Sequence, residues 1–92
     1  MKLEVKNMYL VKSGEAATKA YCNVIIGDFL ISNIRLVQGK NGLFLSFPEK
    51  KMEDKRTGEV QYEAYCKVMD KKMLKDLHHL VFTTYQQKLG KQ

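Results

Sequence analysis

Six basic side chains of this 92-residue chain are grouped in a way that could bind phosphate. Four follow the single proline and two stand at the start of a stretch with helical periodicity: Lys50, Lys51, Lys55, Arg56, Lys71 and Lys72. Cations of this kind contact the phosphates of DNA or RNA. Four acidic residues are interleaved with them, so a solvated charged loop is the alternative: Glu49, Glu53, Asp54 and Glu59. A joint site requires that the loop and the helix start lie close together.

Tyrosine rings are a second group that could contact nucleic acid, because an exposed ring stacks on an unpaired base. Four of them lie in segments with the alternation of β-strands: Tyr9, Tyr21, Tyr62 and Tyr65. Aromatic residues on a sheet also serve as packing residues. Both interpretations stay open on the sequence alone.

Catalytic and metal-binding patterns are missing from the sequence. It contains no nucleophile elbow, phosphate-binding loop, dinucleotide fingerprint or paired-cysteine metal spacing. We therefore expect no enzymatic activity, no cofactor, no metal site and no small-molecule substrate. His78 and His79 are about 100° apart around a helix axis, so they cannot face one site. We expect both to be partly exposed helix residues, with metal ligation by one of them and a cysteine as the alternative.

The composition is that of one soluble globular domain spanning residues 1–92. Hydrophobic residues make up 45% of the chain, and the net charge of +6 suits either a polyanionic partner or simple solubility. No apolar run reaches the roughly 18 residues of a membrane helix, so we expect a cytoplasmic protein. A core this small is enlarged by association, which favours an oligomer. Cys22 and Cys66 are predicted to be reduced thiols in the core.

Apolar residues at alternating positions predict an antiparallel sheet of five strands joined by hairpins. The strands are expected at residues 3–10 (with a bulge near Asn7), 20–26, 29–37, 43–47 and 60–68. Gly27-Asp28 and Asn41-Gly42 are hairpin turn signals. Pro48 ends the fourth strand, because it has no amide hydrogen for the ladder.

The period of the apolar residues changes from two to 3.6 after Asp70, which predicts one amphipathic helix from about Lys71 to Lys88. Asp70 is the expected N-cap, and Gly90 lies just beyond the expected end. The segment 49–59 is predicted to be an exposed loop or the tip of a long hairpin. A sheet followed by one helix is an α+β fold of two layers. The helix is expected to pack on the sheet face that carries Val24, Ile34, Leu45 and Tyr62 or their neighbours.

The segment Ala20–Lys51 resembles the core of the SpoVG family (stage V sporulation protein G, also called septation protein). The hallmark is a Gly-x-x-Gly-Leu-Phe turn and a later proline followed by basic residues, matched here by Gly39, Gly42, Leu43, Phe44, Pro48, Lys50 and Lys51. The chain departs from the family pattern in a longer, more acidic loop at 52–58 and in a short tail after Tyr85. Tyr65-Cys66 also stands where a His-Pro pair is common.

The resemblance implies a small homodimeric bacterial regulator of septation, sporulation-related or virulence genes that binds DNA and, in some members, RNA. The family's nucleic-acid contacts carry over to Lys50 and Lys51, and through the altered loop to Lys55 and Arg56. The competing interpretation is a dimeric protein–protein interaction module whose positive charge is incidental.

Overall fold

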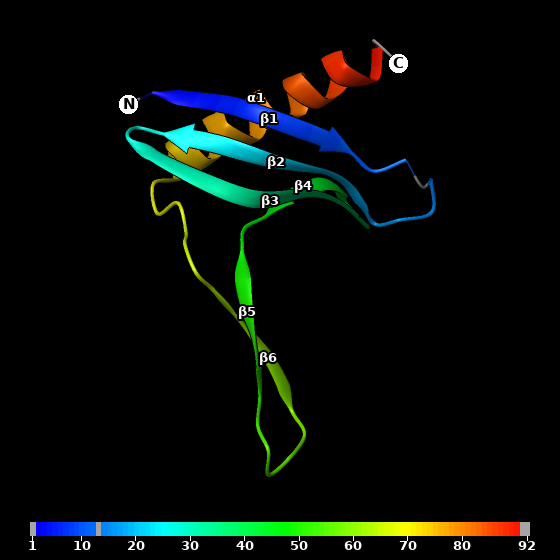
Figure 1. Ribbon diagram of the computed structural model, residues 1–92, viewed down its shortest axis with the longest axis vertical. Helices are drawn as coiled ribbons and strands as arrows, with labels where there is room; N and C mark the ends of the chain where they lie inside the picture. Colours follow the sequence, from blue (N-terminus) through cyan, green and yellow to red (C-terminus); the bar gives the residue numbers. More distant parts are fainter. Residues whose placement is uncertain (1, 13, 91–92) are drawn as a thin grey trace.

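Four antiparallel strands form the main sheet of the computed structural model, which describes residues 2–12 and 14–90. Their bounds are β1 (Leu3–Leu10), β2 (Thr18–Ile26), β3 (Phe29–Gly39) and β4 (Gly42–Ser46). The strands pair in the order β1-β2-β3-β4, so each one lies beside its neighbour in the chain (Figure 1). The predicted succession of hairpins is confirmed for these four strands.

Glycines shape the turns that join β2 to β3 and β3 to β4. Gly27 has a φ of 61° in the first turn, a left-handed value that costs glycine little. The second turn is closed by the pair Gly39 and Gly42. A Cβ added to Gly39 would lie 2.9 Å from a ring carbon of Phe44, so the aromatic ring occupies the space above this glycine. The predicted bulge near Asn7 is confirmed by a register shift in β1.

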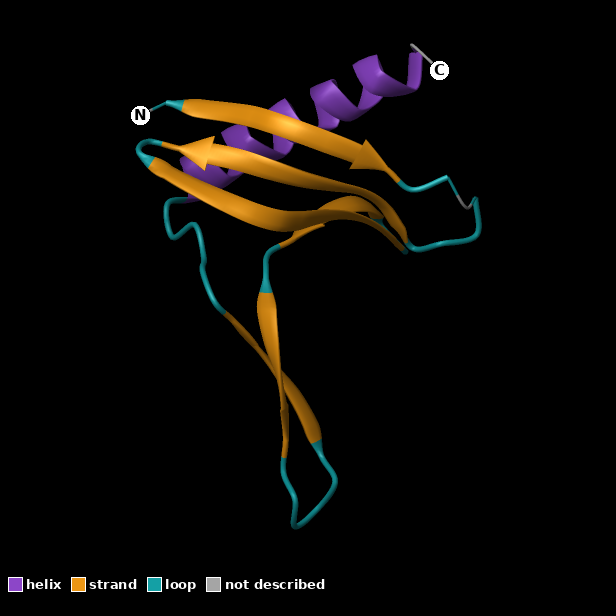
Figure 2. Ribbon diagram, viewed as in Figure 1, coloured by secondary structure: helices purple, strands orange, loops and turns teal. Residues whose placement is uncertain are grey.

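Helix α1 (Lys71–Gly90) covers one face of the sheet and leaves the other face open (Figure 2). Its N-cap is Asp70, as predicted, because the Asp70 Oδ1 accepts hydrogen bonds from the backbone N–H of Lys72 (2.8 Å) and Met73 (3.1 Å). Gly90 belongs to the helix and does not lie just beyond its end as expected. In the part of the chain described, no helix has both the length and the apolar character needed to cross a membrane.

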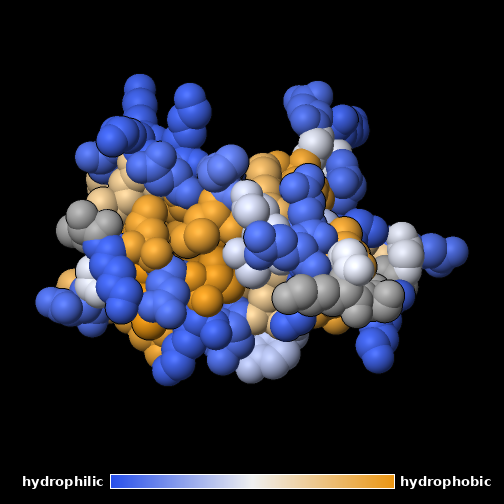
Figure 3. Space-filling model, turned by 90° about the horizontal axis from the view of Figure 1, so that it is seen from above, coloured by the Kyte–Doolittle hydropathy of each residue, from blue (hydrophilic) through white to orange (hydrophobic). Residues whose placement is uncertain are grey.

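The core lies between α1 and the covered face of the sheet. Its buried residues are Met8, Ala20, Cys22, Val24, Ile26, Ile34, Leu36, Leu45, Leu77 and Val81. The helix therefore packs where the sequence predicts, but Tyr62 is 62% exposed and its expected place in the core is wrong. Seen from above, apolar side chains also reach the surface between hydrophilic flanks (Figure 3). The core is thus small and incompletely covered.

Residues 49–64 form a separate hairpin, here called the arm, that projects away from the sheet (Figure 1). Its two antiparallel strands are β5 (Glu49–Glu53) and β6 (Val60–Ala64). The molecule is 48 Å long and its radius of gyration is 14.6 Å, whereas a compact chain of this length has about 12 Å. Of the two expectations for the segment 49–59, the long hairpin is therefore correct.

The α+β class is confirmed, but the five-stranded sheet is wrong: the sheet has four strands, and the arm is a second sheet of two. The sequence predicts a fifth strand at 60–68 with one face in the core, whereas β6 ends at Ala64 and Val60 is 41% exposed. Alternation with a period of two identifies an extended strand. It does not specify that another layer packs against that strand.

The two cysteines differ in exposure, which gives a chemical test of the core. Burial raises the pKa of the Cys22 thiol to about 11, whereas Cys66 is only half-buried, so its expected place in the core is wrong. We expect a dithionitrobenzoate reagent to modify Cys66 in the native protein and Cys22 only after unfolding. The native protein should then show one reactive thiol per chain, and Cys66→Ser should show none. Two thiols reacting rapidly in the native parent would contradict the buried position of Cys22.

Candidate nucleic-acid interface

Lys50 and Lys51 lie at the base of the arm, on β5. The strand register places Lys50 opposite Glu63 and Lys51 opposite Tyr62. Both lysines are exposed, and neither forms an ion pair with any residue that the structure describes. Their ammonium groups are therefore available to a phosphate group.

Lys55 and Arg56 lie at the tip of the arm, in a turn that its own polar groups hold in shape. The Asp54 Oδ1 accepts a hydrogen bond of 2.9 Å from the backbone N–H of Arg56. The backbone N–H of Gly58 donates to the carbonyl oxygen of Asp54 at 2.8 Å, with Gly58 at a φ of 72°. One of the acidic side chains of the arm thus has a structural role in presenting the two cations.

The charge of the arm as a whole is not positive. Residues 49–64 contain four basic and five acidic side chains. All ten residues of β5 and β6 except Ala64 are exposed, so water screens these charges from one another. Contact with a polyanion must therefore depend on local pairs of cations rather than on a uniformly positive surface.

The six basic residues singled out from the sequence do not form one site. Lys71 and Lys72 begin α1, which packs on the sheet. Lys55 and Arg56 lie at the tip of the arm, the end that points away from the sheet (Figure 1). The tip of the arm is therefore not close to the helix start, although a joint site of all six residues requires this (Figure 1). The six residues form three separate pairs, at the base of the arm, at its tip and at the start of α1.

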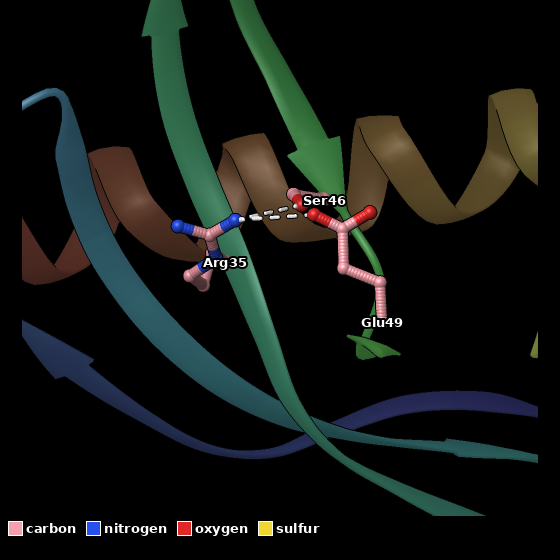
Figure 4. Close-up of polar contacts among 3 residues, drawn as sticks. All are labelled: Arg35, Ser46 and Glu49. Carbon is pink, nitrogen blue, oxygen red and sulfur yellow. Dashed lines mark hydrogen bonds and ion pairs between the residues drawn. The ribbon is translucent and has the colours of Figure 1, made fainter. Parts of the chain in front are cut away.

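Arg35 is a basic residue beside the arm that the sequence analysis does not single out. Its Nη2 donates a hydrogen bond to the Ser46 Oγ at 3.1 Å and lies 4.0 Å from the Glu49 Oε1 (Figure 4). The other terminal nitrogen is directed away from both acceptors (Figure 4). A register shift between Cys22 and Val24 brings Arg35 opposite Tyr21, and no turn signal in the sequence reports that shift.

A hollow of about 490 Å³ lies between β4, the start of α1 and the chain that follows the arm. We call it the apolar hollow, and its lining includes Phe44, Leu45, Ala64, Cys66, Val68, Leu74 and His78. His78 is half-buried and His79 is exposed, as the sequence predicts. Although His78 and Cys66 share this hollow, the described residues contain no group of three side chains placed to hold a metal ion.

The burial of His78 predicts a pH dependence of stability. Its ring lies 5.6 Å from that of Phe82, and desolvation lowers the pKa of His78 below its ordinary 6.5. The unfolded chain therefore binds a proton at His78 more readily than the folded chain does. The stability that depends on a neutral His78 is fully present above pH 6.5 and is lost as the pH falls below that value. Urea unfolding between pH 7.5 and 5.5 should show a smaller loss of stability for His78→Gln than for the matched variant His79→Gln. Equal losses for the two variants would contradict this assignment.

In the described part of the chain, a four-stranded meander, a covering helix and a projecting arm with exposed cations make up a small α+β protein. The family model for SpoVG matches residues 1–87, and the chain therefore belongs to the SpoVG family. It is 29% identical over 70 residues to an Archaeoglobus fulgidus protein named "Putative septation protein SpoVG". That match covers 74% of this chain and 82% of the relative.

Proposed function

We propose that this SpoVG-family protein is a small nucleic-acid-binding regulatory protein that holds phosphate groups with its arm. The observation that supports the proposal best is the exposure of Lys50 and Lys51, with no ion-pair partner among the described residues, at the base of a projecting hairpin. Lys55 and Arg56 form a second pair of exposed cations at the tip of the arm. Cation pairs at two levels of a ribbon can contact phosphates at two places along a nucleic acid.

The shape of the arm also suits a nucleic acid. A two-stranded β-ribbon fits the major groove of B-DNA, which is about 12 Å wide. Because the arm is not covered by another layer, side chains on both of its faces can reach a phosphate backbone. Lys71 and Lys72 would form a separate, secondary contact at the start of α1. We propose no catalytic step and no cofactor for this function.

The biological process that we propose for the protein is control of septation or of sporulation-related genes in the cytoplasm. The name of the Archaeoglobus relative refers to septation, and the family name refers to sporulation. A binding protein without its own chemistry acts on such a process by occupying DNA or RNA.

We further propose that the working form is a homodimer. In the described structure β1 and β4 are edge strands, and each has one side that pairs with no other strand. Unprotected edges, an isolated two-stranded arm and surface apolar side chains (Figure 3) all favour association. Light scattering should give twice the 10.7 kDa chain mass at micromolar concentration. A mass of one chain up to 0.1 mM would reject the dimer.

The proposed function is tested by direct binding. Fluorescence anisotropy with labelled duplex DNA, single-stranded DNA and RNA of one sequence should give dissociation constants below about 10 µM at low salt, weakening as salt rises. The order of the three affinities identifies the natural partner. If none of the three binds at 50 mM salt, the proposal is wrong.

A protein–protein interaction module is the second candidate, and the apolar hollow is the observation that favours it. This hollow adjoins the open edge of β4, where an added strand from another protein would find unpaired backbone groups. A partner protein that stays bound after nuclease treatment, together with no measurable binding to nucleic acid, would favour this candidate over the first.

A further inference from the structure

The open face of the sheet carries a line of side chains that crosses all four strands. The register pairs Tyr9 with Tyr21, Tyr21 with Arg35, and Arg35 with Ser46. Cys22, which follows Tyr21 in β2, is buried under α1. Because side chains alternate along a strand, the line lies on the face that the helix does not cover.

A second hollow, of about 450 Å³, lies where this line meets the base of the arm. We call it the tyrosine hollow, because three tyrosines and two cations line it: Tyr21, Tyr62, Tyr65, Arg35 and Lys51. Its volume falls within the range of about 300–1,000 Å³ that is usual for small-molecule sites. The residues come from the sheet and from both strands of the arm, so the fold is what brings them together.

The tyrosines of this hollow are not packing residues. Tyr21 is 42%, Tyr62 62% and Tyr65 70% exposed, although an aromatic ring in a core would be covered. The backbone N–H of Tyr65 donates to the carbonyl oxygen of Pro48 at 2.9 Å, which fixes this residue at the base of the arm. The rings are therefore presented to solvent by a defined backbone. Of the two sequence interpretations, the structure favours a platform for stacking.

The cations of the hollow are placed to contact a group that lies on these rings. Arg35 is held by Ser46 through one nitrogen, while its Nη1 forms no hydrogen bond with the described residues (Figure 4). Glu49, which also lines the hollow, lies 4.0 Å from the Arg35 Nη2 and is thus partly neutralised. Lys51 lies opposite Tyr62 in the arm. A flat ring stacked here would have two positive charges beside it.

We propose that the tyrosine hollow binds an unpaired nucleobase of a single-stranded nucleic acid, with the adjoining phosphate contacted by Lys51 and Arg35. This inference rests on the proposed function and specifies its ligand. In a duplex each base is already stacked and paired, so only a single strand can offer its ring face to the tyrosines. The same face exists on every base, so the site is expected to tolerate different sequences.

The test compares a fluorescein-labelled 12-nucleotide oligo(dT), its RNA counterpart oligo(U), and an abasic DNA strand of the same length. The abasic strand keeps the phosphates and lacks the bases. The parent should bind oligo(dT) more tightly than the abasic strand. Tyr62→Ala and Tyr65→Ala should each weaken oligo(dT) binding by about 5- to 150-fold and leave abasic binding unchanged. Tyr62→Phe keeps the ring and should keep the affinity, and Tyr85→Phe on α1 is the control outside the hollow.

The outcomes separate this inference from the proposed function. If the abasic strand binds as tightly as oligo(dT), or Tyr62→Ala and Tyr65→Ala leave oligo(dT) binding unchanged, the base site is overturned while phosphate binding stands. If neither strand binds, the base site is overturned, and the proposed function is overturned with it only if duplex DNA and RNA also fail to bind. If the alanine variants convert a dimer to a monomer and keep the preference for oligo(dT), the hollow belongs to a subunit interface and the base site is again overturned. Thermal unfolding by circular dichroism checks that each variant is folded, and oligo(U) against oligo(dT) shows which sugar is preferred.

Discussion

The double variant Lys50→Ala/Lys51→Ala is expected to bind nucleic acid about 10- to 100-fold more weakly than the parent protein at 50 mM salt. Each lysine that contacts a phosphate releases a condensed counterion, and at low salt that release is strongly favourable. Both side chains are exposed on β5 and make no ion pair among the described residues, so their removal leaves no buried group unsatisfied. The loss of affinity should therefore occur in a folded protein, and fluorescence anisotropy measures it.

The matched control removes the same amount of charge far from the arm. Lys12 and Lys40 are exposed and lie outside the arm, near the turns at the end of the sheet. If binding depends only on net charge, Lys12→Ala/Lys40→Ala will weaken it as much as the arm variant does. We expect the control to lose less than threefold. Equal dissociation constants for the parent and both double variants would show that these two lysines of the arm do not contribute to binding.

Replacing Leu77 by alanine is expected to lower the free energy of unfolding by about 2–5 kcal/mol, the cost of truncating a buried leucine. Leu77 is fully buried between α1 and the sheet. A domain of this size has a total stability of roughly 5–14 kcal/mol, so the loss is a large share of it. Urea unfolding followed by circular dichroism gives the difference directly.

Leu89 provides the control for this prediction on the same helix. It is 44% exposed, so Leu89→Ala removes little buried surface and should change the stability by less than about 1 kcal/mol. If the two substitutions cost the same, the helix does not pack on the sheet through the face that contains Leu77.

The sheet and the helix could be predicted from the sequence because their signals are local. Gly27 marks a two-residue turn, and a left-handed φ of 61° is what glycine tolerates there. Asp70 precedes a change of apolar period from two to 3.6, and its carboxylate caps the helix as expected. Such signals depend on a few adjacent residues and not on the rest of the fold.

The arm could be predicted only in part from the sequence. Its second strand alternates like one in a packed sheet, but no other layer of the described structure packs against the arm. Val60 and Tyr62 alternate with polar residues as they would in a half-buried strand, yet both are exposed on β6. β5, with the sequence EKKME, offers no apolar face to recognise. Sequence alone therefore identified a candidate hairpin in this segment without showing that it leaves the sheet.

The candidate site could likewise be predicted only in part from the sequence. The lysines next to Pro48 could be selected by their spacing, but their distance from Lys71 is a property of the fold. Arg35 was missed because a bulge in the pairing of β2 with β3 shifts the register by one residue. That shift places Arg35 opposite Tyr21, whereas the turn at Gly27 alone would place Ile34 there.

The salt dependence of binding shows whether Lys50 and Lys51 of the arm contact phosphates. Dissociation constants for the most tightly bound nucleic acid are measured between 50 and 300 mM salt for the parent and for Lys50→Ala/Lys51→Ala. Each lost phosphate contact lowers the slope of log affinity against log salt by about 0.7–0.9. The slope of the variant is expected to be smaller in magnitude by about 1.4–1.8 because two contacts are lost. Identical slopes for the parent and the variant would contradict phosphate contact by Lys50 and Lys51.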